Sequence, residues 1–168
     1  MRDILIQIQR EIDELQGKLA ELETREQPVI ACDVYNNANI IHTNTGNWQT
    51  LTFNSEMSDP YGMHSTSINT ERVIAPLGGW YLATGHLVFA ANTTGMRGLM
   101  IQLNGATLLA VDGRNAQSSG ATWISIACLS KLDAGDYLTM MGYQSSGGNL
   151  DMLYVSRYSP FFRVIKLP

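Results

Sequence analysis

Residues 79–90 read GWYLATGHLVFA, and this stretch from Gly79 to Ala90 decides the fold. Successive side chains of a β-strand point to opposite faces, so the segment has two apolar faces. One face carries Tyr81, Ala83, Leu87 and Phe89, and the other carries Trp80, Leu82 and Val88. A strand of an antiparallel sandwich usually leaves one face in water. We therefore expect one face to pack in the domain core and the other against a neighbouring subunit.

Two further segments repeat this two-faced pattern. Leu99, Ile101 and Leu103 alternate with Met100, and Leu138 and Met140 alternate with Tyr137, Met141 and Tyr143. A threefold arrangement of subunits buries such second faces. We predict that the head contributes Trp80, Leu82, His86, Val88, Tyr137 and Tyr143 to a trimer interface.

The rest of residues 29–168 forms short β-rich runs separated by turn residues, which predicts an all-β head. The predicted strands cover residues 29–35, 49–54, 72–75, 79–90, 97–104, 107–111, 121–130, 136–144 and 161–167, with a weaker one near Ile40. This number suits a two-sheet sandwich. Asn104-Gly105 predicts a type I′ hairpin, because that turn needs positive φ at both central residues. Residues 113–115 and 145–149 are expected to be exposed loops.

The first 26 residues follow a heptad pattern. Their apolar residues recur at alternating spacings of three and four, and they are Leu5, Ile8, Ile12, Leu15, Leu19 and Leu22. Isoleucine at both core positions favours three strands. We predict a trimeric coiled-coil stalk over residues 1–26, ended by Pro28, and a head over residues 27–168. The alternative is an amphipathic helix packed on its own domain.

The charge content of the chain and its apolar start exclude several classes of function. Charged residues make up only 15% of the chain, where an average domain has about 25%, and charge is depleted where subunits meet. The net charge of −4 and the lack of a basic run speak against nucleic-acid binding. The apolar start at residues 4–8 is too short for a signal peptide or a membrane span. We therefore expect synthesis in the cytoplasm, where Cys32 and Cys128 are two free thiols.

Several motifs of the head resemble those of the complement-C1q/tumour-necrosis-factor-like jelly-roll family. They are APLGGWY at residues 75–81 preceded by Thr52-Phe53-Asn54, the Asn104-Gly105 hairpin, LDAGDYLTM at residues 132–140, and SPFF at residues 159–162. The resemblance implies a ten-stranded jelly roll that trimerises through its inner sheet edges. The sequence departs from the family where Phe162-Arg163-Val164 replaces a usual glycine, and the coil replaces the family's collagen stalk.

The combination of a short coil and such a head resembles bacteriophage fibre, head-fibre or capsid decoration proteins. That resemblance implies a non-catalytic protein of the virion surface whose stalk docks on capsid or tail proteins. The head then faces outward, where a glycan or protein of the host surface is a further partner. The alternative is an extracellular C1q-type adhesive or signalling ligand, for which Asn92-Thr93-Thr94 offers a glycosylation site.

Catalysis has no support in the sequence. His42, His64 and His86 belong to no catalytic or metal-binding motif. The sequence therefore contains no group of residues that would support an enzyme with active sites between subunits. Family members sometimes hold calcium, and the acids that could serve here are Asp112, Asp133, Asp136 and Asp151. Turn capping explains these aspartates better, and we expect no cofactor.

Polar, glycine-rich loops are the candidates for recognition, because tyrosine and asparagine suit contacts with sugars and proteins. The residues singled out in them are Tyr35, Asn36, Tyr61, His64, Asn115 and Gln117. Ordinary connecting loops use the same residue types.

Overall fold

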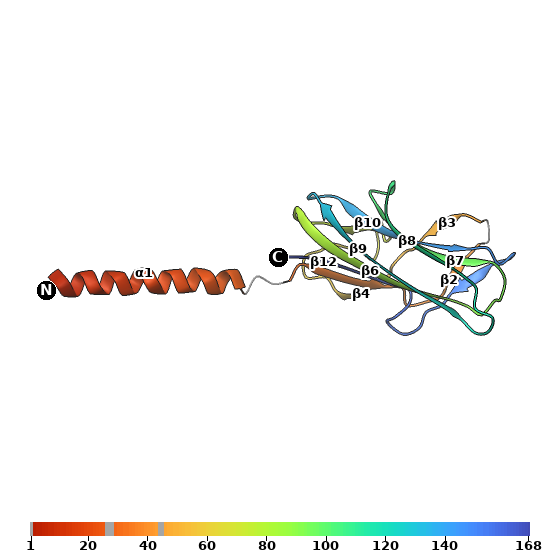
Figure 1. Ribbon diagram of the computed structural model, residues 1–168, viewed down its shortest axis with the longest axis horizontal. Coiled ribbons are helices and arrows are strands. Elements are labelled where there is room, and N and C mark those ends of the chain that lie inside the picture. The colour runs from red at the N-terminus through yellow and green to blue at the C-terminus, as the bar shows by residue number, and fades with distance from the viewer. Residues whose placement is uncertain (1, 26–28, 44–45) are drawn as a thin grey trace.

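The computed structural model describes residues 2–25, 29–43 and 46–168. The helix α1 (Arg2–Arg25) projects as a rod from a head built of β-strands (Figure 1). The expected end of the helix at Pro28 and the boundary between residues 26 and 27 lie outside the described residues. No described helix combines the length and apolar character needed to cross a membrane.

Every side chain described in α1 is exposed, so the helix does not pack on its own head. Bonds between residues four apart support it, such as Gln9 Nε2 to Asp13 Oδ1 at 2.9 Å and Lys18 Nζ to Glu14 Oε1 at 2.6 Å. The alternative of an amphipathic helix folded against its own domain is therefore wrong.

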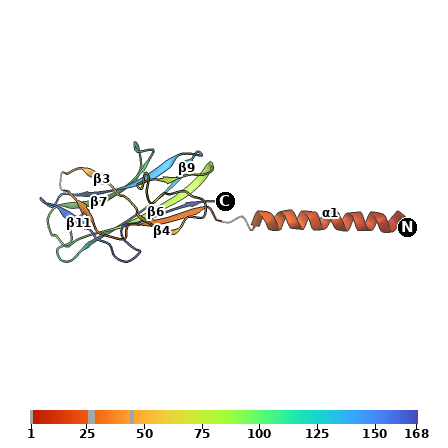
Figure 2. The same cartoon turned by 180° about the vertical axis from the view of Figure 1, so that it is seen from behind.

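Twelve strands are described in the head, and they form two antiparallel sheets. The first sheet, here the β6 sheet, contains β1 (Ala31–Tyr35), β2 (Ile40–His42), β4 (Ser55–Ser58), β6 (Gly79–Phe89), β9 (Thr122–Leu132), β11 (Leu150–Met152) and β12 (Phe161–Lys166). The second, the β7 sheet, contains β3 (Trp48–Thr50), β5 (Val73–Ile74), β7 (Met96–Leu103), β8 (Thr107–Asn115) and β10 (Tyr137–Gln144). Figure 2 shows the two layers from behind, with β3 and β7 above β6 and β4.

Pairing in the β6 sheet centres on β6. Strand β9 pairs with it from Gly79 to Phe89, and its other edge pairs with β12 and, at Phe89, with β11. Strand β1 lies between β12 and β4. In the β7 sheet, β10 pairs with β3, β5 and β7, and β8 forms the outer strand beside β7.

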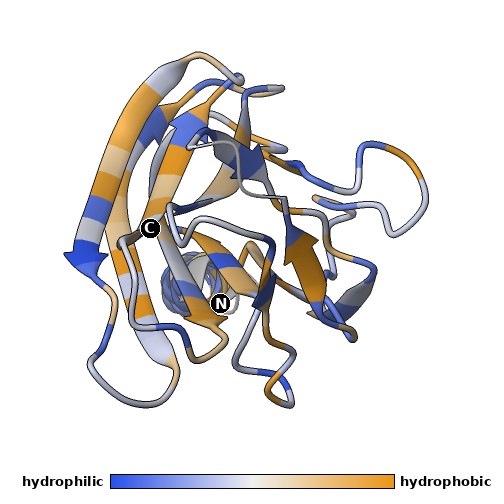
Figure 3. Ribbon diagram, turned by 90° about the vertical axis from the view of Figure 1, so that its right-hand side faces the viewer, coloured by the Kyte–Doolittle hydropathy of each residue, from blue (hydrophilic) through white to orange (hydrophobic). Residues whose placement is uncertain are grey.

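The core lies between the two sheets. Tyr81, Ala83, Leu87 and Phe89 are all buried there, which confirms the expected core face of β6. Phe53 and Phe162 stack in its centre with ring centroids 6.0 Å apart. Hydrophobic and hydrophilic residues alternate along the strands, as Figure 3 shows from the end opposite the stalk.

The Asn104-Gly105 hairpin is confirmed, with φ of 53° and 69° at the two residues. The expected loop at residues 113–115 is wrong, because these residues continue β8 and pair with Met96–Gly98. The prediction also missed β4 and β11, which are only four and three residues long. Tertiary pairing overrides local turn propensity at these places.

Candidate subunit interface on the β6 sheet

The outward face of the β6 sheet is built from rows of directly paired residues. Opposite residues of an antiparallel pair project to the same side, so the pairing partners of Trp80, Leu82 and His86 share their face. The rows are Lys131–Trp80, Leu129–Leu82–Ile165, Ala127–Thr84–Arg163–Asp33, Ser125–His86–Phe161–Tyr35 and Trp123–Val88.

Large apolar side chains on this face are open to solvent. Trp80 is 52% exposed, Trp123 is 53% exposed and Leu129 is 55% exposed. Trp80, Leu129 and half-buried Leu82 lie in adjacent rows at one end of the face, and Trp123 lies at the other end, beyond the rows of Thr84 and His86. A surface of this kind on a folded domain marks a site of association.

Two polar contacts cross the middle of the face. His86 Nδ1 lies 2.9 Å from Ser125 Oγ, and its ring lies 6.1 Å from that of Phe161. Arg163 donates from Nε to Asp33 Oδ1 at 2.6 Å, and this hydrogen bond raises the pKa of Arg163. The charges on the face are therefore paired with each other where they lie between apolar rows.

Val88 shares the register of this face but is buried. Its backbone N–H donates to Ser159 Oγ at 2.8 Å, and its carbonyl accepts from the N–H of Leu153 at 2.7 Å. The segment between β11 and β12 therefore runs beside this end of β6. Of the residues predicted for the interface, Trp80, Leu82 and His86 are thus together and accessible.

Tyr137 and Tyr143, also predicted for the interface, lie elsewhere. Both belong to β10 in the β7 sheet, where Arg72 stacks 4.4 Å from the Tyr137 ring centroid. Sequence periodicity identifies two-faced strands but does not say which sheet each strand joins. The prediction did not include Trp123 and Leu129, which pairing with β6 brings onto the same face.

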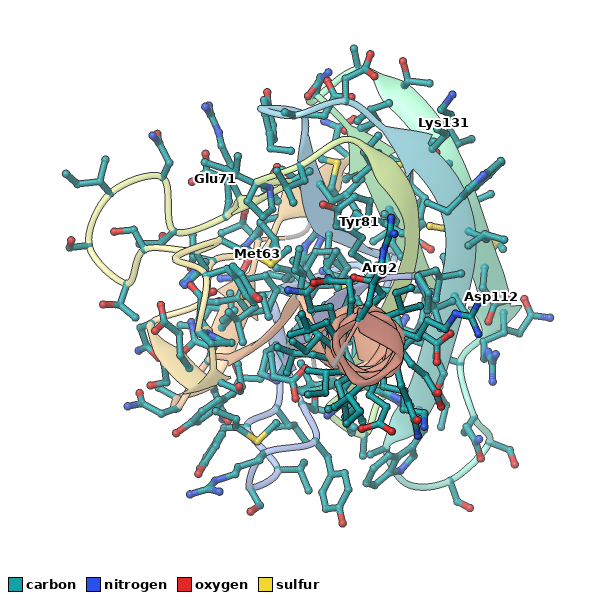
Figure 4. The ribbon with its side chains drawn as sticks, turned by 90° about the vertical axis from the view of Figure 1, so that its left-hand side faces the viewer. Arg2, Met63, Glu71, Tyr81, Asp112 and Lys131 are labelled. Atoms are coloured by element: carbon teal, nitrogen blue, oxygen red, sulfur yellow. The ribbon has the colours of Figure 1, made fainter. Side chains whose placement is uncertain are left out.

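A second apolar surface lies at one edge of the sandwich. Strands β8 and β9 belong to different sheets but lie side by side there, as the labels Asp112 and Lys131 indicate in Figure 4. Leu108 and Val111 of β8 are exposed at this edge, where pairing with Gln102 and Met100 places them on the outward side of the β7 sheet. One chain therefore presents an apolar face and a separate apolar edge.

The predicted seam of α1 is uncovered in the single chain. Its residues Leu5, Ile8, Ile12, Leu15, Leu19 and Leu22 range in exposure from 41% at Ile12 to 64% at Leu15. Burying one such side chain is worth about 1.5–3 kcal/mol, so the seam favours contact with other helices.

Three solved structures of animal proteins superpose on most of this chain. Eiger TNF from S. frugiperda superposes with a TM-score of 0.62 at 16% identity, covering 84% of this chain and 94% of that chain. Murine APRIL gives 0.63 at 15% identity over 83% and 99% of the two chains. The globular domain of zebrafish complement 1qA gives 0.56 at 17% identity over 82% and 97%.

The head is a TNF- and C1q-like jelly roll. At these identities the likeness shows the fold and nothing further. The expected jelly-roll sandwich is confirmed. No protein-family profile matches the chain.

One curated sequence relative is viral. An uncharacterized protein of Acanthamoeba polyphaga mimivirus is 34% identical over 80 residues, which are 45% of this chain and 34% of that protein. The chain thus spans about a third of the length of this relative.

The jelly-roll head uses two of the predicted recognition residues structurally. The Asn36 amide donates to the Thr52 carbonyl at 2.9 Å and accepts from the Ala38 N–H at 3.1 Å. His64 is buried, with its ring nitrogens 2.9 Å from Glu56 Oε1 and 3.1 Å from the Thr70 carbonyl. Neither side chain is presented to a partner, because both complete the hydrogen bonding of loops.

The other candidates for recognition are spread over the jelly roll. Tyr35 is half-buried in the β6-sheet face, and Tyr61 packs against the core. Asn115 ends β8, and Gln117 lies in the following loop; both are exposed. Asn115 and Gln117 are thus near neighbours in the chain, whereas the predicted set as a whole forms no single site.

Of the four candidate calcium ligands, Asp133 and Asp136 share one turn, where the Asp136 carboxylate accepts from the Asp133 N–H at 2.8 Å, and Asp112 and Asp151 belong to the separate strands β8 and β11. Asp112 pairs with Arg114, Asp136 accepts from Asn104 Nδ2 at 2.8 Å, and Asp151 Oδ2 lies 3.3 Å from Asn39 Nδ2. Across residues 2–25, 29–43 and 46–168, no three His, Cys, Asp or Glu side chains come together as a metal site requires.

Cys32 and Cys128 are free thiols on two strands of the β6 sheet. They occupy one row, Cys32–Val164–Ala83–Cys128, so two strands lie between them. Three strand spacings of about 4.8 Å place them well beyond the roughly 7 Å that a disulfide spans between Cα atoms. Burial raises the pKa of both thiols.

Proposed function

We propose that this chain forms a homotrimer through its head and serves as a non-catalytic fibre or decoration protein of a virus particle. The observation that carries the trimer is the exposed apolar surface of Trp80, Trp123 and Leu129 on the β6 sheet. About half of each side chain is left in water, which costs a part of the roughly 1.5–3 kcal/mol that complete burial of a large apolar side chain is worth. Contact with another copy removes this cost.

The two apolar surfaces of one chain suit a closed ring of copies. A head-to-tail interface joins one patch on a subunit to a different patch on the next. Here the β6-sheet face can receive the β8 edge with Leu108 and Val111. The resemblance to TNF and C1q domains supports three copies in the ring.

The stalk supports the same assembly. Three parallel copies of α1 bury the heptad seam and form a rod about 36 Å long at 1.5 Å per residue. In our proposal this rod docks on capsid or tail proteins, and the head faces outward. There it contacts a glycan or protein of the host surface with the avidity of three linked copies.

The viral assignment draws support from the mimivirus relative, which shares 34% identity over 80 residues. Within viruses, the short coil joined to a jelly roll favours a bacteriophage fibre, head-fibre or capsid decoration protein. Immunogold labelling of intact particles of the virus that encodes the chain tests this. Labelled particles support the proposal, and particles that lack the protein after it is expressed overturn it.

The trimer is tested by light scattering on the purified chain. We expect a threefold mass for the wild type and a monomer for Leu129→Arg, because three arginines cannot be buried on the apolar face without partners. Ile68→Arg is the matched control, since Ile68 is 70% exposed in a loop away from this face. A monomeric wild type, or a trimeric Leu129→Arg variant, contradicts the proposed interface.

The second candidate is an extracellular C1q-type adhesive or signalling ligand. The observation that favours it is the likeness of the head to Eiger TNF and murine APRIL. A glycan on Asn92 of the natural protein would support this candidate over the virion protein. The distance between Cys32 and Cys128 already speaks against an intrachain disulfide in either case.

A further inference from the structure

One row of paired residues on the outward face of the β7 sheet brings two aromatic rings beside two glycines. The row consists of Trp48 on β3, Tyr143 on β10, Gly98 on β7 and Gly113 on β8. All four positions project to the same side of the sheet. The Trp48 and Tyr143 rings lie 5.4 Å apart at an angle of 45°.

The glycines shape this surface. A Cβ atom at Gly98 would lie 2.7 Å from Cη2 of Trp48 and 3.1 Å from Cβ of Tyr143, so only glycine lets the indole lie against the strand. A Cβ atom at Gly113 would have its nearest neighbours at 3.8 Å, so this position is an open shelf beside the rings. We call Trp48, Tyr143, Gly98 and Gly113 the aromatic platform.

The neighbouring rows border the aromatic platform on two sides. Thr50, Met141, Met100 and Val111 form the row on one side. On the other side Met96 pairs with Asn115, and its backbone N–H donates to Ser145 Oγ at 2.9 Å. The aromatic platform is therefore a shallow apolar surface with amide and hydroxyl groups along one border.

Polar groups at the aromatic platform lack partners. Within the part of the chain that the structure describes, Trp48 Nε1, Tyr143 Oη and the Asn115 amide make no hydrogen bond. Half-buried tyrosine and tryptophan normally satisfy these groups with a polar partner or water. These three groups around two rings have no partner among the described residues and reach the surface, so they can exchange hydrogen bonds with a ligand.

Charge is absent from this surface. None of the residues of the aromatic platform and its two borders is charged, and neither are residues 90–96 and 144–149 of the adjacent loops. The nearest charged residues on β8 are Asp112 and Arg114. They project to the opposite side of the strand from Val111 and Gly113, and they form an ion pair with each other. A charged ligand finds no counter-charge here.

We propose that the aromatic platform binds a neutral saccharide. A pyranose ring presents apolar C–H groups on its face and hydroxyl groups on its rim. The face fits against Trp48 and Tyr143, and the rim hydroxyls meet Trp48 Nε1, Tyr143 Oη and the Asn115 amide. This inference deepens the host-surface adhesion proposed above, and it requires only the folded head. Three linked copies raise a weak affinity through avidity.

Titration calorimetry and saturation-transfer NMR on the full chain test the site. The probes are neutral hexasaccharides of glucose, mannose, galactose and N-acetylglucosamine, with a sulfated oligosaccharide as the charged comparison. We expect at least one neutral probe to bind with little salt dependence, and Trp48→Ala and Tyr143→Ala each to weaken it by about tenfold or more. Tyr158→Ala, which removes an exposed tyrosine outside the aromatic platform, should leave the affinity unchanged.

Gly113→Gln separates loss of the site from loss of the fold. Its Cβ meets only ordinary contacts, so the protein should melt as the wild type does, while the side chain covers the shelf and weakens binding. Binding of no neutral probe, of the sulfated probe alone, or of a host protein without any saccharide overturns the proposal, as does full affinity of a folded Gly113→Gln. Saccharide binding by a monomeric Leu129→Arg variant would show that the saccharide site does not depend on the trimer, so the two proposals can be tested separately.

Discussion

Buried polar residues hold the loops at the end of the head away from the stalk. The fully buried Arg97 donates from Nη1 to the carbonyls of Thr94 and Met96 at 3.0 and 2.9 Å, and from Nη2 to that of Asn92 at 3.0 Å. Burial lowers the pKa of Arg97, and no described carboxylate pairs with it. Hydrogen bonds to backbone carbonyls therefore offset the cost of burying this charge. The compact ammonium group of a lysine could not reach the same carbonyls with the same geometry.

Asp136 has the corresponding role at the end of the head near the stalk. Its carboxylate accepts from Asn104 Nδ2 at 2.8 Å and from the backbone N–H of Asp133 at 2.8 Å. The Asn104 side chain in turn accepts from the N–H of Tyr137 at 3.0 Å. One carboxylate thus links the hairpin between β7 and β8 to the turn before β10.

This linkage predicts a pH dependence of stability. The hydrogen bond from Asn104 lowers the pKa of Asp136, so the folded state holds its proton less tightly than the unfolded chain. The stabilisation is present above the unfolded pKa of about 3.9 and is lost as pH falls through the lower folded value.

In thermal melts, we expect Asp136→Asn to lower the midpoint at pH 7 and to reduce the further loss on acidification below about pH 4. Glu21→Gln, a carboxylate change in the stalk, is the control. An Asp136→Asn variant as stable and as acid-sensitive as the wild type would show that the linkage contributes nothing.

At the scale of elements, the head and the stalk hold their apolar residues differently. Strand β6 buries one face in the core of its own chain and leaves Trp80 and His86 of the other face exposed. The helix α1 buries none of its seam within the chain. Slightly more than three heptads is close to the minimum for a stable isolated coil, so we expect the proposed stalk to depend on the head for its assembly.

The stalk prediction follows from this difference. Replacing Ile12 and Leu15 by Asp places charges in the seam, and we expect the helical signal in circular dichroism to fall while light scattering still shows a trimer. The control pair Gln7→Asp and Ala20→Asp lies outside the seam and should keep the helix. If the chain with both changes at Ile12 and Leu15 were a monomer, the main contact between copies would lie in the stalk and not in the head.

At the scale of the whole molecule, the proposed trimer couples stability to assembly. The side chains of Trp80, Trp123 and Leu129 on the β6-sheet face and of Leu108 and Val111 on β8 are exposed in the single chain, and association would bury them. An equilibrium that favours the folded state through association depends on protein concentration. The proposed trimer therefore has a measurable signature apart from its mass.

We expect the melting midpoint of the wild type to rise with protein concentration, because mass action opposes dissociation on unfolding. The monomeric Leu129→Arg variant should melt at one temperature over the same range, and Ile68→Arg should follow the wild type. A wild-type midpoint independent of concentration would argue that the copies do not stabilise each other.

Local pattern was sufficient for much of the fold. The alternation in residues 79–90 predicted both the core face of β6 and its exposed second face, because side-chain direction follows from strand geometry alone. The hairpin at Asn104-Gly105 was predictable for the same reason, since its φ angles depend on those two residues. The strand at residues 113–115 was not predictable from the sequence, because the pairing of these residues with β7 outweighs their turn propensity.

The candidate sites show the limit more clearly. Tyr137 and Tyr143 were grouped with Trp80, yet they lie on the other sheet, and Tyr143 instead meets Trp48. Asn36 and His64 are residue types that often take part in recognition, but here their side chains form hydrogen bonds within the head. The sequence by itself determined which strands have two apolar faces and which helix has an apolar seam. Only the tertiary structure decided which of these surfaces lie together, because sheet order and pairing join residues far apart in the chain.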